Sequence, residues 1–281
     1  MGQGEVVMLT NQVFHKGILW VYLNGRCNFT CEYCLDDRNS LPGAIDDHPD
    51  YISRLVSLQN LLGFSLVLTG GEPMLSFQTV LDIYKAFPHV PKCIQTNGAL
   101  PDRLAKLMLF CRPHDWFSIS YHQETLEQPV KQKAVNRSID ILVEAGLKVH
   151  IQFMCSPKNI PMMLEQAAQY GERGCKVSMR RLFEHSPDLF EPYMDKIRKV
   201  NSDPWATAAF FLHEDERRQP FNAAVIYLDG TIAMVCSKEI KVGNLYTGYD
   251  LTAIEPYRTE MCDRVCHCCS CKWVDYEWGF A

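Results

Sequence analysis

The sequence predicts an α/β protein built on a curved, open (β/α)6 sheet. Six short β-rich runs alternate with helix-length stretches, which is the pattern of βαβ units and a parallel sheet. Six units are fewer than the eight that close a full barrel. The strands are expected at 18–24, 65–69, 92–96, 116–121, 148–154 and 176–182. The helices are expected at 50–62, 77–87, 102–110, 131–145 and 162–173, with Gly146 as a helix C-cap.

Composition and charge exclude several classes of protein. With 47% hydrophobic and 11% aromatic residues, the 281-residue chain is not largely disordered. Its net charge of -5 argues against nucleic acid or an anionic membrane as the main partner. The longest apolar runs, such as 18–23, are far shorter than the ~20 residues of a membrane-spanning helix. No signal peptide is evident, so we expect a cytoplasmic location, where thiols stay reduced.

Thirteen cysteines in a reducing compartment indicate metal or redox chemistry rather than disulfides. Three of them, Cys27, Cys31 and Cys34, follow the first predicted strand as CxxxCxxC. Three thiolates at this spacing can bind one corner of an iron–sulfur cubane and leave one iron open. A zinc site completed by a distant residue, or a chance grouping of cysteines, is the alternative. Four scattered cysteines are expected to be ordinary small apolar residues: Cys93, Cys111, Cys155 and Cys175.

Polar motifs follow the next three predicted strands. GGEP lies at 70–73, TNG at 96–98 and SISYH at 118–122. The glycines of GGEP can let the backbone approach a ligand, and Glu72 can accept a hydrogen bond from an ammonium group. Each motif alone is a weak signal. Because ligands of such sheets bind at the carboxyl ends of the strands, the order of the motifs predicts a site there.

The cysteine motif and GGEP together resemble the radical S-adenosylmethionine (SAM) superfamily over about residues 15–185. The resemblance implies a partial radical SAM barrel in which Cys27, Cys31 and Cys34 hold a [4Fe–4S] cluster. The open iron would bind the methionine moiety of SAM. One electron, from a flavodoxin- or ferredoxin-type donor, would give a 5′-deoxyadenosyl radical that removes a hydrogen atom from the substrate. The residues implied to contact SAM are Tyr33, Gly70, Gly71, Glu72, Asn97, Ser120 and Gln152.

His122 departs from the pattern of many relatives, which have an acidic residue at this position. We consider two roles for it. The imidazole could contact substrate or shuttle a proton, or it could be a solvated loop histidine.

The alternating pattern ends near residue 185. A helix is expected at 188–200, and a hairpin at 223–228 and 231–235 turns at Asp229-Gly230. This region, 186–281, resembles the cysteine-rich SPASM/twitch extensions of the same superfamily. Six thiols suffice for one auxiliary [4Fe–4S] cluster but not for two. The expected ligands are drawn from Cys236, Cys262, Cys266, Cys269 and Cys271, and Cys268 is a candidate hydrogen-atom donor to a substrate radical. A zinc knuckle is the alternative.

Two enzyme functions remain open. The first is oxidation or epimerisation of a small polar metabolite, such as an amino sugar, a cyclitol or a nucleoside. Polar residues at strand ends favour it, among them His122, Gln123, Arg180 and Arg181. The second is modification of a ribosomally made peptide by a thioether, a carbon–carbon crosslink or epimerisation. About fifteen residues precede the first strand, so no leader-binding domain is expected. A non-catalytic zinc protein that binds a partner is a remote third possibility.

Overall fold

The computed structural model describes residues 17–34, 44–182, 185–201, 210, 223–234 and 241–251. Within these ranges ten strands form one sheet in the order β10-β9-β8-β7-β1-β2-β3-β4-β5-β6. The six predicted strands are present and pair in parallel in chain order, which confirms the expected α/β architecture. They are β1 (Ile18–Tyr22), β2 (Ser65–Thr69), β3 (Lys92–Thr96), β4 (Trp116–Tyr121), β5 (Lys148–Cys155) and β6 (Lys176–Arg181).

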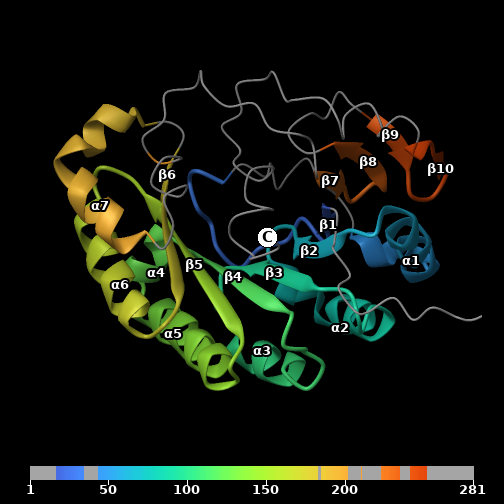
Figure 1. Ribbon diagram of the computed structural model, residues 1–281, viewed down its shortest axis with the longest axis horizontal. Coiled ribbons are helices and arrows are strands. Elements are labelled where there is room, and N and C mark those ends of the chain that lie inside the picture. Colours follow the sequence, from blue (N-terminus) through green and yellow to red (C-terminus); the bar gives the residue numbers. More distant parts are fainter. Residues whose placement is uncertain are drawn as a thin grey trace, which may run out of the picture.

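Helices connect these strands along the outer face of the curved sheet (Figure 1). The main helices are α1 (Tyr51–Leu62), α2 (Phe77–Ala86), α3 (Pro101–Leu107), α5 (Pro129–Glu144) and α6 (Ile160–Glu172). Short helices are η1 (Ile45–Asp47), η2 (Pro73–Ser76) and α4 (Gln123–Glu127). Ala145 is the C-cap of α5, and the predicted Gly146 follows it with a φ of +69°, the left-handed glycine that commonly ends a helix.

The structure corrects three helix boundaries. The helix expected at 102–110 ends at Leu107, and the helix expected at 131–145 begins at Pro129, a residue suited to a first turn. The single helix expected at 188–200 is divided into η3 (Pro187–Tyr193) and α7 (Met194–Val200). Pro192 lies at the division, where its missing N–H prevents a continuous α-helical hydrogen-bond ladder.

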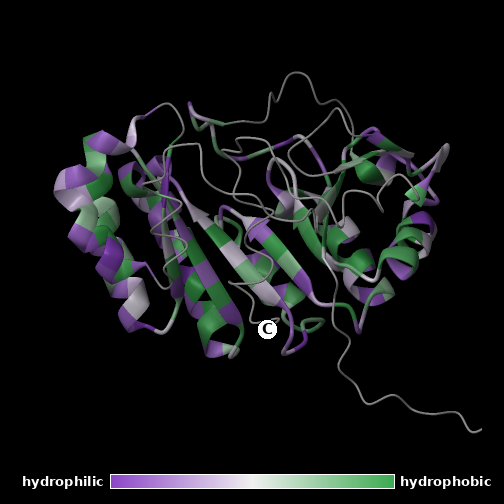
Figure 2. Cartoon of the chain, turned by 45° about the horizontal axis from the view of Figure 1, so that its top comes forward, coloured by the Kyte–Doolittle hydropathy of each residue, from purple (hydrophilic) through white to green (hydrophobic). Residues whose placement is uncertain are grey.

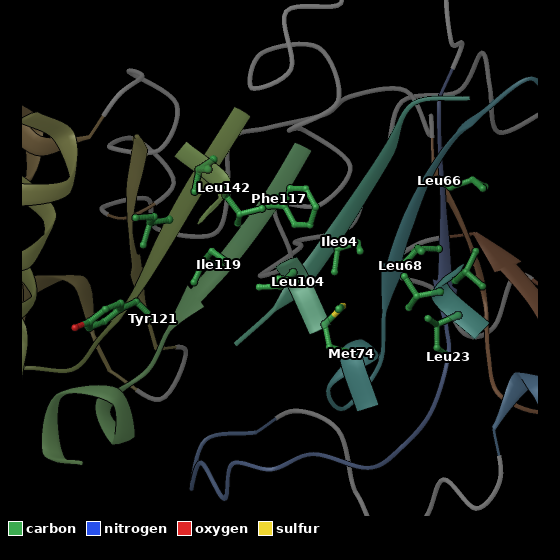
Figure 3. Close-up of a cluster of buried hydrophobic side chains, with 14 of the residues drawn as sticks. Leu23, Leu66, Leu68, Met74, Ile94, Leu104, Phe117, Ile119, Tyr121 and Leu142 are labelled. Carbon is green, nitrogen blue, oxygen red and sulfur yellow. The ribbon is translucent and has the colours of Figure 1, made fainter. Parts of the chain in front are cut away.

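Side chains alternate between the two faces of the sheet and form two apolar clusters. The larger cluster packs strand residues against the helices, and its members include Leu23, Leu68, Ile94, Leu104 and Phe117 (Figure 3). In Figure 2 apolar residues alternate with polar ones along several strands, and the helices also carry both kinds, as expected for helices that bury one side. The smaller cluster lies on the opposite face of the sheet and comprises Ile18, Val67, Cys93, Trp116, Val225 and Ala233.

Four further strands of the described chain, which follow the six parallel strands in the sequence, extend the same sheet beside β1. Strand β7 (Ala223–Ile226) pairs in parallel with β1. Strands β8 (Thr231–Met234), β9 (Lys241–Asn244) and β10 (Gly248–Tyr249) then follow in antiparallel order. The predicted hairpin is therefore confirmed, and Gly230 at its turn has a φ of +80°. The boundary proposed near residue 185 stays a prediction.

In the part of the chain that the structure describes, no helix combines the length and the apolar character needed to cross a membrane.

Candidate functional site

The three clustered cysteines lie in a loop, residues 27–34, that we call the cysteine loop. It leaves the carboxyl edge of the sheet after β1, and the chain before it runs alongside the GGEP motif. The Gly71 N–H donates to the Asn24 carbonyl over 2.8 Å, and the Glu72 N–H donates to the Arg26 carbonyl over 2.7 Å. Pairing between the first two strand segments thus continues to the residue before Cys27.

The GGEP glycines allow this close pairing. A Cβ on Gly70, where φ is +138°, would lie 2.4 Å from the Asn24 carbonyl oxygen. A Cβ on Gly71 would lie 2.2 Å from the Arg26 carbonyl oxygen. Both distances are far inside van der Waals contact, so only glycine fits. These glycines therefore hold the cysteine loop, and their predicted contact with the methionine amine of SAM stays a prediction.

Glu72 is fully buried and joins the ends of β2 and β3. One carboxylate oxygen, Oε1, accepts hydrogen bonds from the Met74 N–H (2.9 Å) and the Thr96 hydroxyl (2.7 Å). The other, Oε2, accepts one from the Asn97 N–H (2.8 Å). Burial raises the pKa of this carboxyl group, although the three hydrogen bonds act in the opposite direction. Glu72 thereby fixes the TNG motif next to GGEP, and its contact with SAM stays a prediction.

Asn97 connects the TNG motif to the cysteine loop. Its Nδ2 donates to Asn28 Oδ1 over 2.8 Å and to the Cys27 sulfur over 3.8 Å. The Phe29 N–H donates to the same sulfur over 3.4 Å. Hydrogen bonds to sulfur favour the thiolate and tune the potential of an iron–sulfur cluster. The surroundings of Cys27 therefore fit a cluster ligand.

The donor set of the loop also fits such a cluster. Cys27, Cys31 and Cys34 are reduced thiols; the first two are half-buried and the third is exposed. Within the described ranges, no three histidine, cysteine or acidic side chains converge on a common point as a metal site would need. The three cysteines therefore fit an iron–sulfur cluster by the type of ligand atom, although their sulfurs are not gathered around one point. Their role as ligands stays a prediction.

Tyr33 and His122 meet across the site. The Tyr33 hydroxyl lies 3.0 Å from His122 Nδ1, and the two rings stack with their centroids 5.8 Å apart. The Gln123 N–H also donates to the Tyr33 hydroxyl, over 3.4 Å. Burial raises the pKa of Tyr33, so this hydroxyl stays protonated. The histidine thus contacts the residue expected beside the adenine, and its role toward substrate stays a prediction.

Ser120 and Gln152 are neighbours across β4 and β5. The Gln152 Nε2 donates to the Ser118 hydroxyl over 2.9 Å. Both predicted SAM contacts are half-buried on the face of the sheet that lies away from the helices. At the end of β6, Arg181 donates to the carbonyls of His185 and Phe210, which is a structural use of its guanidinium.

Sequence reasoning missed Asn24. It is fully buried, and its Nδ2 donates to the Glu72 carbonyl (3.1 Å) and to the Ser76 hydroxyl (3.0 Å). Its Oδ1 accepts from the Arg26 N–H over 2.8 Å. A single asparagine after a strand is a common turn residue, so no local signal identified it. The predicted cysteines of the auxiliary site lie outside the described residues, namely Cys236, Cys262, Cys266, Cys268, Cys269 and Cys271.

Comparisons by sequence give matches to parts of known enzymes, and no family model matches the chain. The chain is 46% identical over 61 residues to a GTP 3′,8-cyclase of Synechococcus sp., which is 21% of this chain and 17% of the relative. It is 25% identical over 145 residues to a 7-carboxy-7-deazaguanine synthase of Methanothermobacter thermautotrophicus, which is 47% of this chain and 58% of the relative. The chain thus spans less than two thirds of the length of these curated relatives.

Comparisons by structure show the fold. The structure of anSMEcpe with bound AdoMet matches 85% of this chain and 80% of its own, with a TM-score of 0.63 and 12% identity. The fold and the partial sequence matches support the resemblance to the radical SAM superfamily. Streptococcus suis SuiB bound to its precursor peptide SuiA also matches, over 86% of this chain and 66% of its own, with a TM-score of 0.58 and 17% identity. The SPASM/twitch character of the chain after residue 185 stays a prediction.

Proposed function

We propose that this radical SAM enzyme cleaves SAM reductively at its cysteine loop and oxidises or epimerises a small polar metabolite. Cys27, Cys31 and Cys34 would hold the [4Fe–4S] cluster. The cluster and SAM would supply radical chemistry there, in which a 5′-deoxyadenosyl radical takes a hydrogen atom from a substrate carbon. A flavodoxin- or ferredoxin-type protein would deliver the electron.

The observation that carries this proposal is the set of contacts around Cys27. The backbone of Gly71 and Glu72 holds the segment before the cysteine, and the Asn97 amide donates to its sulfur. The chain thus fixes a thiol at the carboxyl edge of a parallel sheet, the edge where such sheets bind ligands. The protein groups orient the thiolate and stabilise its charge, and the cofactors supply the radical.

The names of the sequence relatives support a small-molecule substrate. A GTP 3′,8-cyclase and a 7-carboxy-7-deazaguanine synthase are named for purine-like compounds, and a nucleoside is one member of the proposed substrate class. The alternative is a peptide substrate. SuiB with its precursor peptide, and anSMEcpe with the Kp18Cys peptide, support that alternative through their shared fold.

The proposal for the C-terminal cysteines is a single auxiliary [4Fe–4S] cluster. Four of Cys236, Cys262, Cys266, Cys269 and Cys271 would bind it, and Cys268 would be a spare thiol. Zinc at the same thiols is the competing assignment.

Cleavage of SAM tests the proposal. Anaerobically reconstituted enzyme with a strong reductant is expected to form 5′-deoxyadenosine, measured by chromatography, and Cys31→Ala to form none. Cys111→Ala changes a half-buried thiol before β4 and serves as the matched control, with wild-type yield expected. Formation of 5′-deoxyadenosine by Cys31→Ala would refute the assignment.

The same assay separates the substrate classes, because a true substrate accelerates 5′-deoxyadenosine formation. Nucleosides, amino sugars and cyclitols are compared with cysteine-containing peptides. Acceleration by peptides alone would replace the small-molecule proposal with the peptide alternative.

A further inference from the structure

A segment far away in the sequence binds the cysteine loop. This segment, residues 122–131, contains α4 and the start of α5, and we call it the α4–α5 elbow. Both the N–H and the hydroxyl of Thr30 donate to Glu124 Oε1, over 2.6 and 2.8 Å. The other oxygen, Glu124 Oε2, accepts from Lys131 Nζ over 2.5 Å. Glu124 therefore bridges the loop and the first turn of α5.

Lys131 makes a second contact with the loop. Its ammonium group lies 4.3 Å from the centroid of the Phe29 ring, in cation–π geometry. Phe29 and Thr30 are the two residues directly before Cys31, so one ion pair contacts the chain between the first two cysteines. Tyr33, between the second and third cysteines, is bound to His122 at the start of the same elbow.

The Glu124–Lys131 pair is partly removed from water. Only 14% of the Glu124 side chain and 22% of the Lys131 side chain are exposed. An exposed ion pair contributes little to the stability of a protein, because water screens its charges. Charge-assisted hydrogen bonds contribute more where this screening is reduced. Burial acts to raise the pKa of Glu124, yet hydrogen bonds from Lys131 and Thr30 outweigh it and lower the pKa. The carboxylate is therefore ionised at neutral pH and accepts from all three donors.

We propose that Glu124 and Lys131 are positioning residues that fix the backbone between Cys27 and Cys31 before a cluster binds. This inference rests on the proposed function, because ordering the cysteine loop matters for cluster binding only if these cysteines are the cluster ligands. Preordering lowers the entropy that the loop loses when its three sulfurs converge on one cluster.

The first test uses the protein without any cluster. Amide hydrogen exchange at Thr30 is measured in the wild type and in Glu124→Ala, Glu124→Gln and Glu127→Ala. Loss of a hydrogen bond to a charged group is expected to speed Thr30 exchange about tenfold to hundredfold in Glu124→Ala. Glu124→Gln keeps an acceptor for Thr30 and loses the charge, so an intermediate rate is expected. Glu127→Ala, an exposed change in the same helix, is expected to exchange like the wild type.

Two further measurements keep this test decisive. Exchange in β4 is followed in every variant, because a general loss of structure would also speed exchange there. Lys131→Met leaves Glu124 in place and removes its cation, and it is expected to speed Thr30 exchange with β4 unchanged. Wild-type exchange at Thr30 in both Glu124→Ala and Lys131→Met would overturn the proposal.

The second test uses the reconstituted enzyme. Glu124→Ala is expected to take up the cluster but to lose iron to a chelator several-fold faster than wild type, as followed by absorbance. Equal iron-loss rates would overturn the link to the cluster. Failure of the wild type to take up iron would instead refute the proposed function, and the exchange results would still report on the elbow.

Discussion

Glu72 shows how one side chain organises the candidate site. One donor from the residue after GGEP and two from TNG converge on its carboxylate, which is fully buried. A buried carboxylate lowers the stability of the fold only slightly while each donor around it has an acceptor. It lowers the stability strongly when one buried donor is left without an acceptor. The residue therefore has a structural task in addition to any contact with SAM.

Replacement of Glu72 by glutamine is expected to destabilise the protein. The amide NH2 of Glu72→Gln would meet either the Asn97 N–H or the donors from Met74 and Thr96, so buried donors would face each other. We expect the free energy of unfolding in urea at pH 7 to fall by about 1–3 kcal/mol. Glu165→Gln, on the exposed side of α6, is the control and should stay near wild type. Equal stability of the two variants would show that the three hydrogen bonds do not require the carboxylate.

The residues that sequence reasoning found and missed differ in a simple way. Cys27, GGEP and Asn97 stand in short motifs, and the structure places each motif after a strand, while their roles toward a cofactor stay predictions. Asn24 and the Thr30–Glu124–Lys131 contact were missed. Thr30 and Glu124 are 94 positions apart, and no period or local composition links such positions.

At the scale of elements, the strands were predictable and the short connections were not. Buried β-rich runs between helices identified β1 to β6 within about two residues at their ends. The helix α4 was missed because its five residues carry no measurable helical period. The α4–α5 elbow, which binds the cysteine loop, is therefore a feature that only the folded chain reveals.

The pairing of GGEP with the segment before the cysteine loop gives a prediction about elements. A Cβ at Gly71 would force the Arg26 carbonyl away and break its hydrogen bond with the Glu72 N–H. We expect Gly71→Ala to lower the free energy of unfolding by about 1–3 kcal/mol, as overpacking does. Gly171→Ala in α6 meets no atom within 4 Å, and it should be neutral or slightly stabilising. Wild-type stability of Gly71→Ala in urea would contradict the close pairing.

At the scale of the whole molecule, the residues of the candidate site lie along one edge of the sheet. The cysteine loop, GGEP, TNG and His122 come from the carboxyl ends of four neighbouring parallel strands, and hydrogen bonds join them into one network. Strands β7 to β10 extend that sheet beside β1. The parallel order followed from the alternation of strands and helices. The position of β7 against β1 did not, because a hairpin pattern does not specify its neighbour.

The central claim is that the cysteine loop holds an iron–sulfur cluster, and an anaerobic count of iron, sulfide and zinc tests it most directly. The wild type is compared with a variant in which Cys27, Cys31 and Cys34 are all alanine. About eight irons falling to about four is the expected result, for one radical cluster and one auxiliary cluster. About four irons falling to none, with zinc retained, would keep the central claim and assign the C-terminal cysteines to zinc. Iron content unchanged by the triple substitution would contradict the account.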